Sequence, residues 1–210
     1  MAALPFRGYP VRRIAFLAFP RLTLLDLVGV YDALRRVGPM RPADEVTHRI
    51  IGTARELEDE SGFRMIADGV YEELAPFDLL VVPGGFGTRT LIDDPRCVDY
   101  VRGWGVERPI ASVCTGALLL GKAGHLEGLR ATTHHNAFDL LRPLCREVVT
   151  DERVVDEGRV VTAGGVTSAL DLGLHLVEKF WGSEARERIA TQMEYRPAPG
   201  LTPSRCGPLP

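Results

Sequence analysis

Short apolar segments that end at proline or glycine constrain the fold of this chain more than any other feature. Residues 12–19 (RRIAFLAF) end at Pro20, and residues 77–82 (FDLLVV) run directly into Pro83-Gly84-Gly85. Apolar runs of this length, bounded by turn residues, are typical of strands buried inside a sheet. Such strands need helices on both faces of the sheet to keep their side chains from water.

Helical patterns alternate with these apolar segments. The stretch 26–36 (DLVGVYDALRR) is amphipathic, with one helix face formed by Leu27, Val30, Tyr31 and Leu34. Alternation of strands with helices predicts an α/β fold with a mostly parallel central sheet, whose functional edge lies at the carboxyl ends of the strands. The other expected elements are strands at 46–52, 109–113 and 131–134, a hairpin over 154–163, an irregular or hairpin excursion over 54–74, and helices at 94–104, 115–123, 136–144, 167–180 and 183–195.

Length and composition fit one globular domain. The chain has 210 residues, of which 45% are hydrophobic, and it can bury a large core without disulfides. We expect the domain to cover residues 11–196, after an N-terminal extension over 1–10 and before an extended or disordered proline-rich tail over 197–210. The net charge of −3 and the lack of a long apolar run argue against nucleic-acid and membrane partners.

The cysteines favour a reducing compartment. None of Cys97, Cys114, Cys145 and Cys206 forms a C-x-x-C pair, and the N-terminus has no signal-peptide pattern. We therefore expect a cytoplasmic protein. No cluster of histidine, cysteine and carboxylate residues has metal-ligand spacing, so no metal site is expected.

Residues 111–117 (ASVCTGA) carry the clearest chemical signal. An apolar strand ends and a helix begins with almost no residues between them, so Cys114 occupies a tight turn of the nucleophile-elbow kind. Gly116 and Ala117 are small enough for the helix to approach the strand closely. A thiol at a helix N-terminus is favoured as the reactive thiolate. The alternative is a buried structural cysteine.

A glycine-rich turn follows the apolar strand at 77–82. In Pro83-Gly84-Gly85-Phe86-Gly87 the backbone N–H groups can point at a ligand, as an oxyanion hole requires. The alternative is an ordinary turn. The turn lacks the G-x-G-x-x-G spacing and the Lys-Ser/Thr of a phosphate loop, so no nucleotide site is expected.

Asp26 and His134 are further candidates at the carboxyl ends of strands. Asp26 is either a helix N-cap or an acid/base group, and partial burial beside Cys114 would raise its pKa. His134 either lines a pocket or is an ordinary polar residue at the end of a strand. Adjacent histidines point to opposite faces of a strand, so His134 and His135 make a poor metal pair.

Taken together, these motifs resemble the ThiJ/PfpI superfamily. The resemblance covers about residues 11–196 and rests on FPRLTLLDLVGVYDAL, LLVVPGGFGT, SVCTGALLLGKAGHLEGLRATTHH and VVTAGGVTSALDLGLHLVE. Within the superfamily the chain is most similar to isonitrile (isocyanide) hydratases and to the sensor domains of AraC-type regulators. The resemblance implies a flavodoxin-like three-layer sandwich, a homodimer, a small-molecule substrate and no cofactor.

The resemblance also implies roles for individual residues. It makes Cys114 the nucleophile and Asp26 its acidic partner, with Thr115 beside the nucleophile. Backbone N–H groups of Gly84, Gly85 and Thr115 would hold developing charge. His134 and Phe86 would line the substrate pocket. Protease-like members have histidine where this chain has Thr115, which argues against peptidase activity.

The leading hypothesis is hydration of an isonitrile to an N-substituted formamide. Cys114 would form a thioimidate, with Asp26 as general acid and base. Three alternatives stay open: a glyoxalase-type hydratase of reactive carbonyls, a non-catalytic ligand sensor, and a redox sensor in which Cys114 is oxidised.

Overall fold

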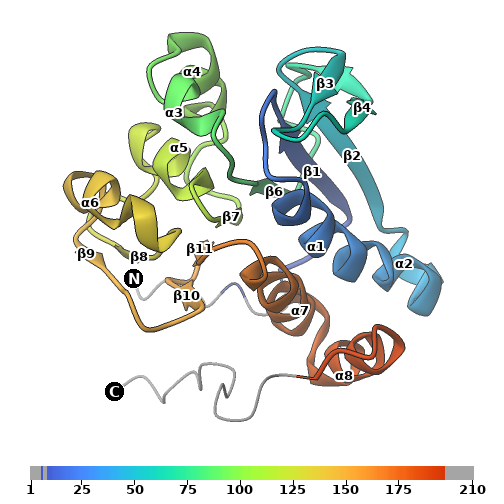
Figure 1. Cartoon of the computed structure of the whole chain (residues 1–210). Helices are drawn as coiled ribbons and strands as arrows, with labels where there is room; N and C mark the ends of the chain where they lie inside the picture. The colour runs from blue at the N-terminus through green and yellow to red at the C-terminus, as the bar shows by residue number, and fades with distance from the viewer. Residues whose placement is uncertain (1–5, 7–8, 197–210) are drawn as a thin grey trace.

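A seven-stranded sheet forms the middle layer of a three-layer α/β sandwich. The computed structural model describes residue 6 and residues 9–196 (Figure 1). The strand order is β10-β11-β7-β6-β1-β2-β5, and every neighbouring pair is parallel except β10 with β11. The strands are β1 (Arg13–Ala18), β2 (Thr47–Gly52), β5 (Gly69–Val70), β6 (Leu79–Val82), β7 (Ile110–Val113), β10 (Val154–Asp156) and β11 (Val160–Ala163).

Helices cover both faces of this sheet (Figure 1). One layer contains α1 (Leu24–Arg35), α7 (Ser168–Trp181) and α8 (Ser183–Gln192), with α1 packed directly against α7. The opposite layer contains α3 (Thr88–Leu91), α4 (Pro95–Arg102), α5 (Gly116–Lys122) and α6 (Phe138–Leu141). Every residue of β6, β7 and β11 is buried, which confirms the predicted double coverage of the apolar strands. None of the helices in the described residues combines the length and apolar character needed to cross a bilayer.

The excursion between β2 and β6 is a hairpin followed by an edge strand. The antiparallel strands β3 (Glu56–Glu58) and β4 (Arg64–Ile66) pair only with each other, and β5 then joins the main sheet beside β2. The hairpin was one of the two predicted alternatives for this segment. The short helix α2 (Val37–Met40), like α3, has four residues and gives too little periodicity to be predicted.

Two predicted elements after α5 are wrong in length. The single helix expected over 136–144 is a 3-10 turn (His135–Ala137), then α6, then a second 3-10 turn (Arg142–Leu144). Pro143 lacks an N–H and disfavours a helical residue before it, so a continuous α-helix cannot form there.

The strand expected over 131–134 is also shorter than predicted. Only β8 (Arg130–Ala131) is a strand, and it pairs with β9 (Glu147–Val148) outside the main sheet. Beyond β8, the Thr132 N–H donates to Thr162 Oγ1 at 2.9 Å, so a side chain replaces a strand partner. The chain therefore turns toward the carboxyl edge of the main sheet instead of extending β8.

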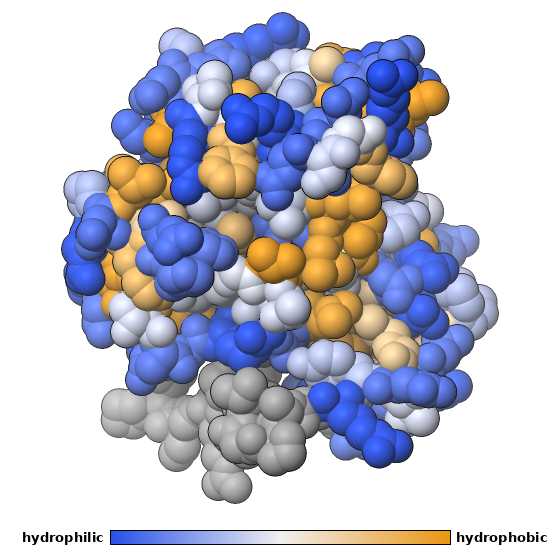
Figure 2. All heavy atoms as spheres, in the orientation of Figure 1, coloured by the Kyte–Doolittle hydropathy of each residue, from blue (hydrophilic) through white to orange (hydrophobic). Residues whose placement is uncertain are grey.

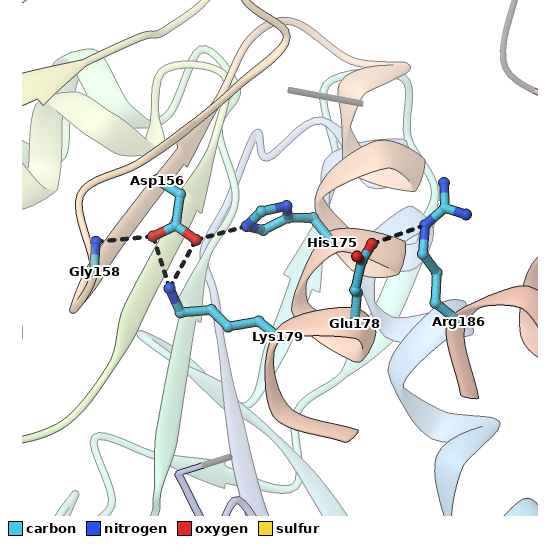
Figure 3. Close-up of polar contacts among 6 residues, drawn as sticks. All are labelled: Asp156, Gly158, His175, Glu178, Lys179 and Arg186. Atoms are coloured by element: carbon cyan, nitrogen blue, oxygen red, sulfur yellow. Dashed lines mark hydrogen bonds and ion pairs between the residues drawn. The ribbon is translucent and has the colours of Figure 1, made fainter. Parts of the chain in front are cut away.

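A buried ionic cluster fixes the edge strand β10 to α7 (Figure 3). Asp156 accepts hydrogen bonds from the Gly158 N–H at 2.8 Å, from Lys179 Nζ at 2.7 Å and from His175 Nε2 at 2.7 Å. Burial alone would raise the pKa of Asp156, but the His175 hydrogen bond and the Lys179 charge outweigh it and bring the pKa to about 2. Asp156 pairs with Val161 near the start of β11, so this cluster lies away from the carboxyl ends of the parallel strands.

Replacing Lys179 by methionine should destabilise the fold. The substitution keeps the apolar stem but leaves the buried Asp156 charge without its ammonium partner, so the free energy of unfolding should fall by about 3 kcal/mol. Urea denaturation at pH 7 measures this loss. Lys122→Met is the matched control, because this other lysine is 40% exposed and 3.9 Å from Asp93, and its loss should stay below about 0.5 kcal/mol. Equal losses in both variants would contradict the role given to Lys179.

Candidate active site

The loops that follow four neighbouring strands meet at one edge of the sheet. Cys114 follows β7, the Gly84-Gly85 turn follows β6, α1 follows β1, and residues 164–166 follow β11. These strands lie in the order β11-β7-β6-β1, so their carboxyl ends are adjacent. This is the edge at which α/β proteins bind ligands.

Cys114 occupies the tight turn predicted between β7 and α5. Its φ of 55° is left-handed, which is strained for a residue with a Cβ. The Cys114 N–H donates to the carbonyl oxygens of Ala163 and Gly164 at 3.0 and 2.9 Å, and its own carbonyl accepts from Thr133 Oγ1 at 2.7 Å. A Cβ at Gly116 would lie 2.3 Å from the Val82 carbonyl oxygen, so only glycine lets α5 start this close to β6.

Asp26 lies beneath Cys114 with no exposed surface. It is the third residue of α1 and does not cap it, because the N-cap position belongs to Thr23. The N-cap interpretation of Asp26 is therefore wrong. Asp26 Oδ2 accepts a hydrogen bond from the Gly84 N–H at 3.1 Å, while Oδ1 has no conventional partner in the described part of the chain. Burial raises the pKa of Asp26 to about 7, although the Cys114 thiol and the Gly84 N–H each lower it.

The Gly84-Gly85 turn positions side chains instead of presenting open N–H groups. The Gly84 N–H binds Asp26, and the Gly85 N–H donates to Thr115 Oγ1 at 3.0 Å. The Thr115 hydroxyl in turn lies 3.1 Å from the Gly85 carbonyl. A Cβ at Gly84 would lie 2.6 Å from the Thr115 nitrogen, so the turn must be glycine to pack here. The prediction that Gly84 and Gly85 form an oxyanion hole is corrected: both N–H groups are already bonded within the protein.

The Cys114 sulfur rests as a thiol. Burial and the charge of Asp26 raise its pKa to about 12, while the backbone N–H groups of Thr115 and Val166 lower it. The sequence predicted a thiolate from the start of α5 alone, and burial next to a carboxylate outweighs that effect. The thiol therefore keeps its proton near neutral pH, and the neighbouring Asp26 carboxylate is the group placed to accept it.

Val166 is a functional position that the sequence analysis missed. It is a β-branched residue with φ of 29°, a conformation that such residues adopt only under constraint. Its N–H is directed at the sulfur of Cys114 and lowers the pKa of that thiol. The only sequence signal at this position is a β-branched residue directly after Gly164-Gly165.

A pocket of about 160 Å³ opens over the sulfur. Phe86 and His134 both line it, as predicted, together with Cys114 and Thr115. Phe86 is 51% exposed and forms part of the rim. Four polar lining residues were not predicted, because they come from segments that only the tertiary fold brings to Cys114: Thr23, Glu60, Arg89 and Asn136.

A second cavity of about 350 Å³ adjoins the first and shares His134 and Val166 with it. His135 lines only this second cavity. The ring centres of His134 and His135 lie 4.3 Å apart, with the rings tilted by 30°, contrary to the prediction that they point to opposite faces. The prediction failed because this segment is not a strand: a 3-10 turn begins at His135. Nowhere in the described residues do three histidine, cysteine or carboxylate side chains form a metal-ligand group.

The arrangement suits covalent chemistry that moves one proton. A thiol at a strained turn faces a small pocket, and a buried carboxyl with a pKa near 7 can take and return its proton. Two backbone N–H groups, from Thr115 and Val166, are placed to stabilise negative charge on the sulfur.

Comparison with known proteins agrees with this geometry. A model of the DJ-1/PfpI family matches residues 12–179, which include all four loops of the site. The isonitrile hydratase of Pseudomonas putida is 35% identical over 188 residues, covering 89% of this chain and 80% of that protein. A solved ThiJ/PfpI family protein from Pseudomonas syringae superposes with a TM-score of 0.79 at 28% identity, covering 96% of this chain and 81% of that one.

A transcriptional regulator is also similar. The HTH-type regulator CdhR of Pseudomonas aeruginosa is 27% identical over 181 residues, which cover 84% of this chain but 53% of the regulator. This chain therefore spans about half the length of that relative. The matches confirm the resemblance and the flavodoxin-like three-layer fold expected from the motifs.

Replacing Asp26 by asparagine should change how stability depends on pH. A carboxyl whose pKa rises from 3.8 to about 7 on folding binds its proton more tightly in the folded state, so wild-type stability falls as the pH rises from about 4 to 7. Asparagine cannot ionise. The free energy of unfolding of the variant, relative to that of the wild type, should therefore rise by on the order of 3 kcal/mol between pH 4 and pH 8.

Urea denaturation of both proteins at pH 4 and pH 8 measures this gain. Asp139→Asn, at an exposed carboxyl on α6, controls for the loss of one surface charge. If the stabilities of Asp26→Asn and the wild type change in parallel with pH, Asp26 does not hold its proton in the fold.

Proposed function

This chain belongs to the DJ-1/PfpI family, and we propose that it is an isonitrile hydratase, a hydro-lyase that converts an isonitrile to an N-substituted formamide. The observation that carries the proposal is the pair of Cys114 and Asp26: a thiol on a strained turn above a buried carboxyl that can exchange a proton near neutral pH. The likeness to the Pseudomonas putida isonitrile hydratase supports this choice of reaction.

In the first step the sulfur of Cys114 bonds to the terminal carbon of R–N≡C. The thiol proton passes to the Asp26 carboxylate as the S–C bond forms, and Asp26 delivers a proton to the same carbon. The product is a thioimidate, R–N=CH–S–Cys, in which the hydrogen on carbon balances the one lost from sulfur. Covalent attachment divides one difficult addition into two easier ones.

In the second step water adds to the thioimidate carbon. Asp26 accepts one proton from the water and passes that proton to the imine nitrogen. The C–S bond then breaks, which gives R–NH–CHO and returns sulfur to Cys114, where the second water proton restores the thiol. The N–H groups of Thr115 and Val166 stabilise the sulfur while it carries charge.

A ligand sensor is the second candidate. The similarity to the regulator CdhR favours a sensor, because the region that matches this chain makes up about half of that regulator. A sensor would bind a small molecule in the pocket over Cys114 and release it unchanged.

We also propose that the protein acts as a homodimer in the cytoplasm, with α1 at the interface. Apolar surface gathers over α1 in Figure 2, and on this helix Leu25 and Val28 are 37% and 38% exposed. Exposed apolar surface of this kind marks association sites. A second copy covering α1 would also lie close to the pocket, since α1 carries Asp26.

Leu25→Asp should weaken this dimer. Sedimentation equilibrium should give about twice the chain mass of 23.1 kDa for the wild type and a shift toward one chain mass for the variant. Ile66→Asp is the control, because Ile66 is 68% exposed but lies on the β3–β4 hairpin. A wild-type protein that sediments at 23.1 kDa would refute the dimer.

Cys114→Ala should abolish formamide formation from an alkyl isonitrile, because Cys114 carries the only thiol among the residues that line the pocket. Asp26→Asn should lower kcat by about 10²–10⁴-fold, the usual contribution of a proton-transfer group. Product formation is followed by chromatography, with circular dichroism to check folding. Cys145→Ala, at a partly buried cysteine that does not line the pocket, should keep full activity.

The two candidates give different results. Turnover by the wild type that is lost in Cys114→Ala supports the hydratase. Binding of an isonitrile without product would support the sensor, and substantial turnover by Cys114→Ala would remove the cysteine from the mechanism.

A further inference from the structure

We propose that Arg89, with His134 and Asn136, binds a carboxylate that the substrate carries on a short substituent of its reacting group. The identity of the reacting group as an isonitrile rests on the proposed function, whereas the carboxylate site rests on the pocket itself. The substrate class is thus a small isonitrile with an acidic substituent.

Arg89 is a cation in the pocket without an ionic partner. No carboxylate among the described residues lies within 4.0 Å of its guanidinium, although most arginines near acidic groups in this protein form such pairs. The guanidinium instead lies 4.9 Å from the ring centre of Phe86. Stacking on an aromatic ring holds the guanidinium plane in place while leaving its N–H edge open to an anion.

His134 adds a neutral donor beside this cation. Its Nδ1 accepts the Asn136 backbone N–H at 3.2 Å, which assigns the ring proton to Nε2. Burial, His135 and Arg89 lower the pKa of His134, so the ring stays neutral near pH 7. Arg89 and His134 both line the pocket, and the guanidinium lies close enough for its charge to act on the ring.

The side chain of Asn136 completes the group. It lines the pocket, and no described residue forms a hydrogen bond with its amide. Arg89, His134 and Asn136 therefore offer three kinds of N–H donor to one small space. A group with several acceptor oxygens and a negative charge, such as a carboxylate, matches this set.

Glu60 is the one carboxylate among the residues that line this pocket, and its charge affects a different group from the charge of Arg89. It contributes to raising the pKa of Asp26, whereas Arg89 acts on the pKa of His134. Among the lining residues, the negative charge of Glu60 therefore acts on the proton-transfer group, and the positive charge of Arg89 acts on His134.

The size of the pocket suits a small substrate. About 160 Å³ holds the isonitrile group and a short acidic substituent. Isocyanoacetate, in which one CH₂ separates the isonitrile nitrogen from the carboxylate, is the smallest probe with this geometry. Its methyl ester has the same skeleton without the charge.

The first experiment measures kcat/KM for isocyanoacetate and for its methyl ester. The wild type should prefer the anion at least tenfold, and Arg89→Gln should reduce this preference at least tenfold, mainly through KM for the anion. Arg21→Gln is the matched control: Arg21 also lies over Phe86, at 5.7 Å, but does not line the pocket, so the preference should persist. A wild type that favours the ester, or an unchanged ratio in Arg89→Gln, overturns the proposal.

A second experiment tests the carboxylate site without any hydratase activity. Iodoacetate and iodoacetamide alkylate the same sulfur and differ in charge, and the Cys114 peptide is followed by mass spectrometry. Arg89→Gln should lower the iodoacetate rate relative to the iodoacetamide rate at least fivefold, and Arg21→Gln should not. If neither isonitrile is hydrated but this ratio depends on Arg89, the proposed function fails and the carboxylate site stands. If both isonitriles are hydrated and neither ratio depends on Arg89, the carboxylate site fails and the function stands.

Discussion

The site depends on the hydrogen bond from the Gly84 N–H to Asp26, which links α1, the turn after β6 and the turn at Cys114. It ties the start of α1 to the turn after β6, and it holds the carboxylate, which has no exposed surface, beneath the sulfur of Cys114. The bond satisfies only one carboxylate oxygen, so the other has the thiol as its neighbour. A buried carboxyl with so few donors keeps its proton to a higher pH, which is what proton exchange with a thiol requires.

Buried Asp26 and partly buried Asp156 show that burial alone does not decide what a carboxylate does. Burial is the largest influence on both, and it raises the pKa of each. At Asp156 the donors His175 and Lys179 reverse that effect and bring the pKa to about 2, which gives a permanent anion that fastens β10 to α7. No cation among the described residues pairs with Asp26, and its pKa stays near 7. The same type of side chain is thus an ion-pair anchor at one end of the sheet and a carboxyl that titrates near neutral pH at the other.

The sequence was sufficient for the local features of the fold and the site. Apolar runs predicted the buried strands, and ASVCTGA predicted the turn at Cys114, because both patterns depend on neighbouring residues. It was not sufficient where segments far apart in the chain determine the outcome. The protonation of Cys114 depends on Asp26, 88 positions earlier, and the N–H groups of Gly84 and Gly85 bind side chains from α1 and the start of α5.

The complete burial of the neighbouring strands keeps the strained backbone at the sulfur in place. Cys114 and Val166 both have left-handed backbones, and both follow strands in which every residue is buried. β7 and β11 pair in register up to Val113 and Ala163, and the Cys114 N–H continues the pairing onto the carbonyls of Ala163 and Gly164. Two strained residues on mobile loops would relax, whereas here relaxation would break these bonds and open the core. The rigid core thus keeps the sulfur and its two N–H donors in position before any substrate arrives, which is the condition for stabilising charge without reorganisation.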